Sequence, residues 1–265
     1  MTAPNTAKLS GVTNFRDFGW LPTLSGGSVK PGILFRSGHL ADADTADIAA
    51  LQALNIAHVA DLRRPEERDK LPTPTALATG WRTLAHDHPT SQTEPPHLAV
   101  LLAPDVSEAA IVARMHTGYR GYPYYPALTE VYRLYFDALA DQDDDQAVLV
   151  HCHAGKDRTG FLVALTHHLL QVSPAALMSD YLRTNQDSRL EQRLPGVIAN
   201  FHKEHGVAPP IDALRKVMQV EADYLHTSLK AITDTDGSVE TYLDRHLGVD
   251  AAQVQRIRRR LVRPN

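Results

Sequence analysis

Cysteine is almost absent from this chain: one thiol, Cys152, stands among 265 residues. A single thiol forms no disulfide within the chain, so we expect no disulfide framework and a fold compatible with a reducing compartment. Long apolar runs are also missing, which predicts no integral membrane association. The opening segment MTAPNTAKLSGVTNF lacks the basic start and apolar core of a secretory signal, so the expected address is cytoplasmic, with unconventional secretion left open.

An excess of positive charge is missing as well. The chain carries 27 basic and 31 acidic side chains, a formal net charge of −4, so its overall charge gives no reason to expect a nucleic-acid partner. Hydrophobic residues make up 43% and charged residues 22%, which is typical of a globular protein with a buried core. Because the sequence has no repeat and no low-complexity linker, we interpret residues 1–265 as a single domain.

The first part of the chain alternates between strand-like and helix-like segments. Helical periodicity follows most of the strand candidates, which lie at residues 32–37, 56–62, 80–86 and 147–152. This alternation predicts an α/β fold with a central, mostly parallel sheet that is flanked by helices.

Two regions differ from that alternation. Residues 87–123 are rich in Pro, His and Thr and have the composition of a long active-site loop with some helix. In roughly residues 173–265 the signals are all helical, and one predicted helix starts at Pro210 and keeps an apolar stripe as far as Ile232. We interpret these helices as additions to the same domain.

The only cysteine lies in the segment HCHAGKDRTG, residues 151–160, between an apolar strand and a helix. The strand places Cys152 at the C-terminal edge of the predicted sheet, where open α/β proteins bind their ligands. Gly155 and Gly160 permit backbone angles and close approaches that a Cβ would block. The loop amides and the helix N-terminus then form an anion site.

The positive potential of this anion site also favours a thiolate at Cys152, which makes this side chain a nucleophile. Arg158 supplies a planar, two-pronged donor for an oxyanion six residues further on. A thiolate, an amide cradle and an arginine fork together predict attack on phosphorus, with no metal and no other cofactor. The alternative is a buried, inert cysteine next to a turn.

The cysteine segment resembles the signature loop of cysteine-dependent protein tyrosine and dual-specificity phosphatases. With NFRDFG, PGILFRSGHL, VADLRRPEER and SDYLRTN, it resembles a bacterial tyrosine phosphatase family that includes a secreted mycobacterial enzyme. The resemblance runs from about residue 11 to the C-terminal helices. It implies a phosphatase-type α/β fold with additional C-terminal helices, some able to form a lid. It also implies phosphotyrosine substrates, with phosphoserine, phosphothreonine and phosphoinositides in some members.

The resemblance implies a role for each residue of the loop. Cys152 attacks phosphorus and forms a thiophosphoryl intermediate, and Thr159 donates its hydroxyl to the sulfur and helps it leave. His151 orients the loop through hydrogen bonds. The equatorial phosphate oxygens are held by the Arg158 guanidinium and by the backbone amides of His153, Ala154, Gly155, Lys156, Asp157 and Arg158.

The leaving oxygen needs a general acid, and the chain has no Trp-Pro-Asp segment of the kind that classical tyrosine phosphatases use. The resemblance implies Asp157 instead, which lies next to the arginine that holds the phosphate. Asp87 and Asp105, in the predicted long loop, are the alternatives. The resemblance also implies that Asp61 pairs with Arg158 and fixes its fork, against the plainer interpretation of an ordinary surface carboxylate.

Lys156 is the residue of the loop that gives an indication of the substrate class. A lysine at this place occurs in phosphatases that accept phosphoinositides, where further phosphates need further cations, and a solvated lysine is the alternative. Arg36 and Arg64 either add positive potential near the site or form salt bridges. The tyrosines within residues 119–125 either wall a deep pocket for a phenyl ring or pack in the core.

Other functions stay open at this point. Metal binding is one of them, and its ligands would be His86, His88, His151, Cys152 and His153. A sulfurtransferase also uses a cysteine in an amide-lined loop, but that class lacks the His-Cys lead and the Arg-Thr-Gly exit. A non-catalytic phosphate-binding module is the third. We expect a phosphomonoester hydrolase whose substrate is a phosphotyrosine protein or a phosphoinositide, and the sequence leaves the oligomeric state open.

Overall fold

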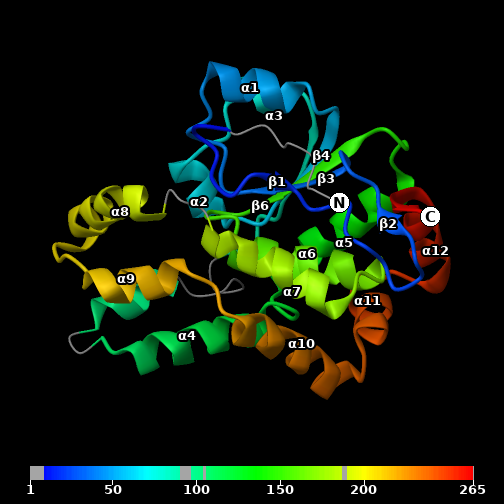
Figure 1. Cartoon of the computed structure of the whole chain (residues 1–265). Coiled ribbons are helices and arrows are strands. Elements are labelled where there is room, and N and C mark those ends of the chain that lie inside the picture. Colours follow the sequence, from blue (N-terminus) through cyan, green and yellow to red (C-terminus); the bar gives the residue numbers. More distant parts are fainter. Residues whose placement is uncertain (1–8, 90–96, 104–105, 187–189, 265) are drawn as a thin grey trace.

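The fold is built around one sheet (Figure 1), in a computed structural model that describes residues 9–89, 97–103, 106–186 and 190–264. Its strands are β1 (Arg16–Asp17), β3 (Leu34–Ser37), β4 (Ile56–Asp61), β5 (Arg82–Leu84) and β6 (Ala147–His151). They form a five-stranded sheet in the order β1-β3-β6-β4-β5. All neighbours are parallel except β1, which pairs antiparallel with β3 at one edge. The predicted α/β fold with a mostly parallel central sheet is confirmed.

Helices cover both faces of the sheet (Figure 1). The smaller core lies on one face, under two short helices, and the larger core lies on the other, under a thick helical layer. The helices that enclose these cores are α1 (Thr45–Gln52) and α3 (Thr75–Ala78) on the first face, and α5 (Pro126–Asp141) and α6 (Asp157–Leu169) on the second.

The central strand β6 contributes to both cores. Val148 and Val150 belong to the larger core, and Ala147 and Leu149 belong to the smaller one. Successive side chains of a strand point to opposite faces, so a strand that is covered on both sides reads as a continuous apolar run. This is the physical reason why the strand before Cys152 could be recognised in the sequence.

Several helices begin where a short polar side chain accepts a hydrogen bond from the first turn. Such an N-cap contributes about 1 kcal/mol to helix stability. The capped helices include α1 (capped by Asp44), α7 (Pro174–Leu182, capped by Ser173), α11 (Val239–Leu247, capped by Ser238) and α12 (Ala251–Leu261, capped by Asp250).

The loop that we predicted at residues 87–123 is in part a helix. Glu108–Gly121 form α4, and the Ser107 hydroxyl caps its first turn. The helix packs through side chains that recur every four residues, namely Ile111, Met115 and Tyr119. The prediction of some helix in this region is therefore confirmed, and the structure places it at Glu108–Gly121.

The helix that we predicted from Pro210 to Ile232 is two helices. The predicted start is confirmed, because α9 spans Ile211–Met218 and Pro210 precedes it. The backbone of Gln219 is extended, and α10 begins again at Ala222 and spans Ala222–Asp236. The apolar stripe therefore continues across a break in the backbone.

The other elements complete the helical layer and join the two ends of the chain. Strands near the two termini pair antiparallel in a second, two-stranded sheet. The C-terminal helices predicted beyond residue 173 are present, while their action as a lid and the single-domain organisation stay predictions. No helix in the described part of the chain is long and apolar enough to cross a membrane. The two strands of the second sheet are β2 (Ser28–Val29) and β7 (Val262–Arg263). The remaining helices are α2 (Pro65–Lys70), α8 (Leu190–His205) and the short 3₁₀ helices η2 (His97–Leu102) and η3 (Arg183–Gln186).

The C-terminal ends of the three middle strands meet at one place. Ser37 of β3 and Asp61 of β4 are both register partners of His151, the last residue of β6. Cys152 follows directly, so the sheet delivers the thiol to the edge where parallel sheets bind ligands.

Two buried tyrosines provide a test of the larger core. The Tyr135 hydroxyl bonds to Thr166 at 3.0 Å, whereas the buried Tyr224 hydroxyl has no hydrogen-bond partner among the described residues. Tyr135→Phe should lower the free energy of unfolding by about 1 kcal/mol, because a buried hydrogen bond is lost. Tyr224→Phe should leave it unchanged or raise it. Urea unfolding measures both, and an equal loss in the two variants would contradict this packing.

Candidate active site

The segment between β6 and α6 is a tight loop that carries Cys152. Gly155 has a φ of +68°, in the left-handed region, and a Cβ at this position would lie 2.2 Å from the Ser37 carbonyl oxygen. The His39 amide donates to the His153 carbonyl oxygen at 2.9 Å. The loop therefore packs directly on the chain that leaves β3, and Cys152 is only 2% exposed.

The helix α6 begins immediately after the loop. At the N-terminus of an α-helix the first backbone N–H groups and the positive end of the helix dipole favour an anion. The strand, loop and helix thus occur in the predicted order, with the loop at the edge where open parallel sheets generally bind their ligands. The amide contacts predicted for residues 153–158 stay predictions.

Arg158 extends from the first turn of α6 to the carboxylate of Glu67 on α2. Its Nη1 donates to Oε2 at 2.7 Å and to the Leu62 carbonyl at 2.9 Å, and its Nη2 donates to Oε1 at 2.9 Å. Burial alone would raise the pKa of Glu67, but Arg158 and Arg64 together outweigh burial and hold this pKa well below its usual range. Such a two-pronged pair fixes the plane of the guanidinium group.

Sequence reasoning missed Glu67, although one signal was available. Glu67 is the third residue of a short helix that begins with Pro65, and at this position a Glu side chain accepts a hydrogen bond from the residue before the helix. The Arg64 amide donates to Glu67 Oε2 at 2.8 Å. Helix capping thus holds Glu67 in place, while both of its carboxylate oxygens accept from Arg158.

The predicted pairing of Asp61 with Arg158 is wrong. Asp61 binds Arg63 instead: Nε donates to Oδ1 at 2.9 Å and Nη2 donates to Oδ2 at 2.7 Å. The alternative of a surface carboxylate is wrong too, because Asp61 is 2% exposed. A partner two residues away can be reached by local folding alone, and Arg158 takes its carboxylate from α2.

Asp157, the predicted general acid, is buried and has partners on both carboxylate oxygens. Oδ1 accepts from the Tyr119 hydroxyl at 2.7 Å and from Lys156 Nζ at 3.0 Å. Oδ2 lies 2.9 Å from the same ammonium group. In this arrangement the contacts stabilise the ionised carboxylate, so proton donation requires a change around the residue.

The Lys156 side chain is 4% exposed, so the interpretation of a solvated lysine is wrong. Besides Asp157, its ammonium group binds the carbonyls of Val217 and Gln219, at 2.7 and 3.1 Å, where α9 ends. These contacts are all with the protein itself, and they do not direct the ammonium group toward an additional substrate phosphate.

Two histidines flank Cys152, and both are neutral at pH 7. Burial lowers the pKa of His151 and the pKa of His153 to about 4. His151 Nδ1 lies 3.3 Å from the Cys152 carbonyl oxygen, where a ring N–H donates to it. This contact agrees with an orienting role for His151.

The Thr159 hydroxyl is buried and has no hydrogen-bond partner among the described residues. The predicted bond from this hydroxyl to the Cys152 sulfur is therefore not formed in this structure, and its role stays a prediction. Among the alternative acids, the Asp87 side chain is 94% exposed and binds Arg68 at 2.6 Å. Asp105 lies outside the described residues.

The remaining candidates near the site form salt bridges or pack in the core. Arg36 is fully buried and binds Asp180 at 3.2 Å, and Arg64 lies 3.6 Å from Glu67. Of the two alternatives for Tyr119, core packing is confirmed, because Tyr119 belongs to the larger core. Its hydroxyl also donates a hydrogen bond to Asp157.

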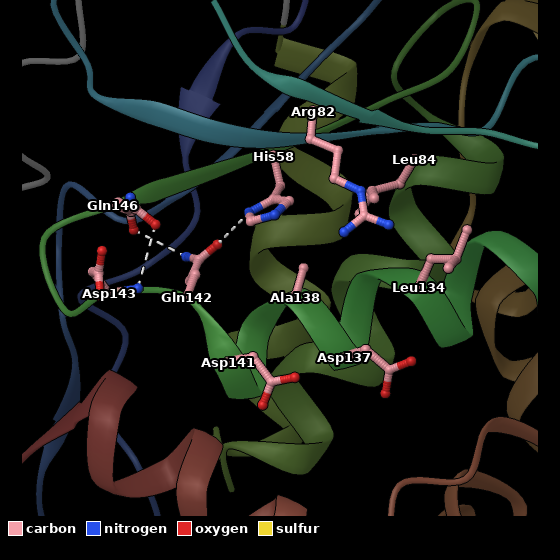
Figure 2. Close-up of a pocket in the computed structure, with 10 residues that line it drawn as sticks. All are labelled: His58, Arg82, Leu84, Leu134, Asp137, Ala138, Asp141, Gln142, Asp143 and Gln146. Atoms are coloured by element: carbon pink, nitrogen blue, oxygen red, sulfur yellow. Dashed lines mark hydrogen bonds between the residues drawn. The ribbon is translucent and has the colours of Figure 1, made fainter.

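A pocket of about 440 Å³ lies against β5 and the end of α5 (Figure 2). In it, His58 and Gln142 form a hydrogen bond of 3.0 Å. The pocket lies toward the amino ends of the strands, at the opposite edge of the sheet from Cys152, so it is separate from the candidate active site. Its lining residues are His58, Arg82, Leu84, Leu134, Asp137, Ala138, Asp141, Gln142, Asp143 and Gln146.

Comparison with known proteins agrees with this geometry. A family model described as "Tyrosine phosphatase family" matches residues 7–263. A Cupriavidus necator protein named "Putative tyrosine-protein phosphatase" is 32% identical over 96% of this chain and 91% of its own length. The "Triple specificity protein phosphatase PtpB" of Mycobacterium tuberculosis is 32% identical over 95% of this chain and 97% of its own length.

The clamp on Arg158 can be tested with Glu67→Gln. The amide keeps the shape of the side chain but loses the charge and one of the two acceptors, so the guanidinium plane is no longer fixed. We expect kcat/KM for para-nitrophenyl phosphate to fall by about 10- to 100-fold, the cost of a charged hydrogen bond. Glu66→Gln, the exposed neighbour, is the control. Equal activity of the two variants would contradict the role of Glu67.

Proposed function

Because the chain belongs to the tyrosine phosphatase family, whose members hydrolyse phosphomonoesters, we propose that it acts through a covalent phosphocysteine at Cys152. The observation that carries this proposal is the juxtaposition of Cys152, the N-terminus of α6 and an Arg158 fork that Glu67 holds in one plane. A thiol, an anion site and an oriented guanidinium group are the parts that in-line attack on phosphorus requires.

In the first step the Cys152 thiolate attacks phosphorus. A sulfur–phosphorus bond forms, the bond between phosphorus and the leaving oxygen breaks, and Asp157 gives its proton to that oxygen. In the second step water attacks phosphorus, the thiolate leaves, and the Asp157 carboxylate takes a proton from the water. Arg158 and the loop amides balance the charge on the equatorial oxygens in both steps.

Asp157 must hold a proton in the first step, although Lys156 favours its ionised form in the free protein. A bound phosphate dianion changes that balance, because a second negative charge near a carboxylate favours the protonated acid. The proton is thus best placed on Asp157 once substrate is bound. Substrate binding and the readiness of the acid are coupled in this way.

We propose a phosphotyrosine-containing protein as the substrate. Cys152 is only 2% exposed, so the phosphate has to reach a deep sulfur, and the phenyl ring of phosphotyrosine spans more depth than the short stems of phosphoserine or phosphothreonine. The name of the mycobacterial relative includes triple specificity, so phosphoserine, phosphothreonine and phosphoinositides belong in the same substrate panel. A cytoplasmic address stays part of this proposal.

Cys152→Ser tests the covalent step. The serine hydroxyl is a far weaker nucleophile than a thiolate, so turnover of phenyl phosphate should fall by at least about a thousandfold. Binding of inorganic phosphate, measured by calorimetry, should persist, because the cradle and Arg158 remain. Substantial turnover by the serine variant would contradict the mechanism, and loss of wild-type activity to a chelator would favour a metal site.

Asp157→Asn tests the acid. We expect kcat/KM for phenyl phosphate to fall by about 10²- to 10⁴-fold, whereas para-nitrophenyl phosphate should lose much less, because its leaving group needs little protonation. The alkaline limb of the pH profile should also disappear. Asp87→Asn is the matched control. If Asp87→Asn shows this discrimination and Asp157→Asn does not, the acid is Asp87.

A further inference from the structure

A buried carboxylate joins two strands beside the cysteine loop. Arg16 on β1 and Arg36 on β3 are direct partners across the antiparallel pair, so two guanidinium groups meet in the interior. Asp180 on α7 is 2% exposed and lies between them, 3.0 Å from Arg16 Nε and 3.2 Å from Arg36 Nη1. Like charges on facing strand positions destabilise a sheet, so this pairing requires the carboxylate.

The charges of the three groups support one another. Burial alone would raise the pKa of Asp180, but Arg16 and Arg36 outweigh burial and hold it well below its usual range. Burial, together with Arg16, lowers the pKa of Arg36 to about 10, so this side chain stays charged at pH 7. Removing any one partner would leave an uncompensated charge in the interior.

Both arginines lead to the same backbone atom, the carbonyl oxygen of Gly155. Arg36 Nη2 donates to it directly, at 2.9 Å. Arg16 acts through Asn14: Arg16 Nη1 donates to Asn14 Oδ1, and Asn14 Nδ2 donates to the Gly155 oxygen at 2.6 Å. Because the amide oxygen of Asn14 is held by an arginine, its nitrogen has to face the carbonyl.

The direction of this carbonyl fixes the direction of the next amide. No described peptide bond is cis, and in a trans peptide the C=O and N–H groups point in opposite directions within one plane. The donors from the β1 and β3 side hold the Gly155 oxygen on their own side. The N–H of Lys156 is therefore turned the other way, and Lys156 is one of the residues whose amide is expected to bind phosphate.

We propose that Asn14, Arg16, Arg36 and Asp180 are positioning residues for the phosphate cradle. They hold the Gly155 carbonyl outside the cradle and so aim the Lys156 amide at the bound phosphate. The inference rests on the proposed function, because it needs a phosphate in the cradle. It gives one purpose to three segments that lie far apart in the chain and meet at this loop.

Asn14→Asp tests the proposal. The variant keeps the size of the side chain and the acceptor for Arg16, but it replaces the donor with an oxygen that repels the Gly155 carbonyl. Asn55→Asp is a matched control. Asn55 also has a positive φ, 52° against 54° for Asn14, and its Nδ2 donates to the Asp145 carbonyl at 3.1 Å, away from the cysteine loop.

The measurements separate oxyanion binding from turnover and from stability. Inorganic phosphate should protect Cys152 against iodoacetamide, and orthovanadate should inhibit hydrolysis of para-nitrophenyl phosphate. In Asn14→Asp we expect both anions to bind about tenfold more weakly or worse, the cost of a misdirected bond to a charged ligand. The alkylation rate without phosphate should stay at the wild-type value. Asn55→Asp should match the wild type in anion binding and in alkylation rate, whatever its effect on Tm.

A purely structural role would lower Tm and leave anion binding in the folded fraction unchanged, and that result would overturn the proposal. If Asn14→Asp does not fold, Asn14→Ala takes its place, because it removes the donor without adding repulsion, and weaker anion binding is again expected. If the wild type itself neither binds phosphate nor hydrolyses phosphomonoesters, the proposed function fails and the positioning role fails with it. Normal wild-type binding with normal binding in a folded Asn14 variant overturns the positioning role alone.

Discussion

A cradle of backbone amides binds an anion only if its peptide planes cannot rotate, and no strand or helix holds the planes between Cys152 and α6. The surrounding structure supplies this restraint. The end of β3 packs so closely on Gly155 that a Cβ would clash with the Ser37 carbonyl. Side chains from outside the loop donate hydrogen bonds to the Gly155 carbonyl oxygen, and the His39 amide donates one to the His153 carbonyl oxygen. Although β6 follows β3 and β4 in the sequence, it lies between them in the sheet, and this order brings the loop after β6 next to the end of β3.

The buried arginines around the site are all paired with buried or half-buried carboxylates. Arg158 has Glu67, Arg63 has Asp61, and the pair of Arg16 and Arg36 shares Asp180, the three partners being drawn from α2, β4 and α7. Buried ion pairs add little net stability, since desolvation offsets their attraction. Their effect here is geometric: each carboxylate fixes one guanidinium plane, and the plane of Arg158 is the one that a phosphate would meet.

The sequence predicted features that a local pattern determines. β6 is apolar throughout because both of its faces are buried, and the glycines and helix that follow define the loop around Cys152. Contacts between distant segments could not be predicted. Asp61 and Glu67 both precede Arg158 by a long stretch, and only the tertiary fold decides which of them reaches it. The apolar stripe after Pro210 survives a break in the backbone, so periodicity alone could not locate the break at Gln219.

Lys156 connects Asp157, the residue that we propose as the acid, to the helices that follow the sheet. The carbonyls of Val217 and Gln219 lie at the C-terminal end of α9, where the helix dipole favours a cation. The same ammonium group binds Asp157, so it links α9 to this carboxylate. A displacement of α9 would therefore also move the ammonium group that Asp157 contacts. The helices that follow the sheet thus help to place the proposed acid, because α9 and Asp157 share one ammonium group.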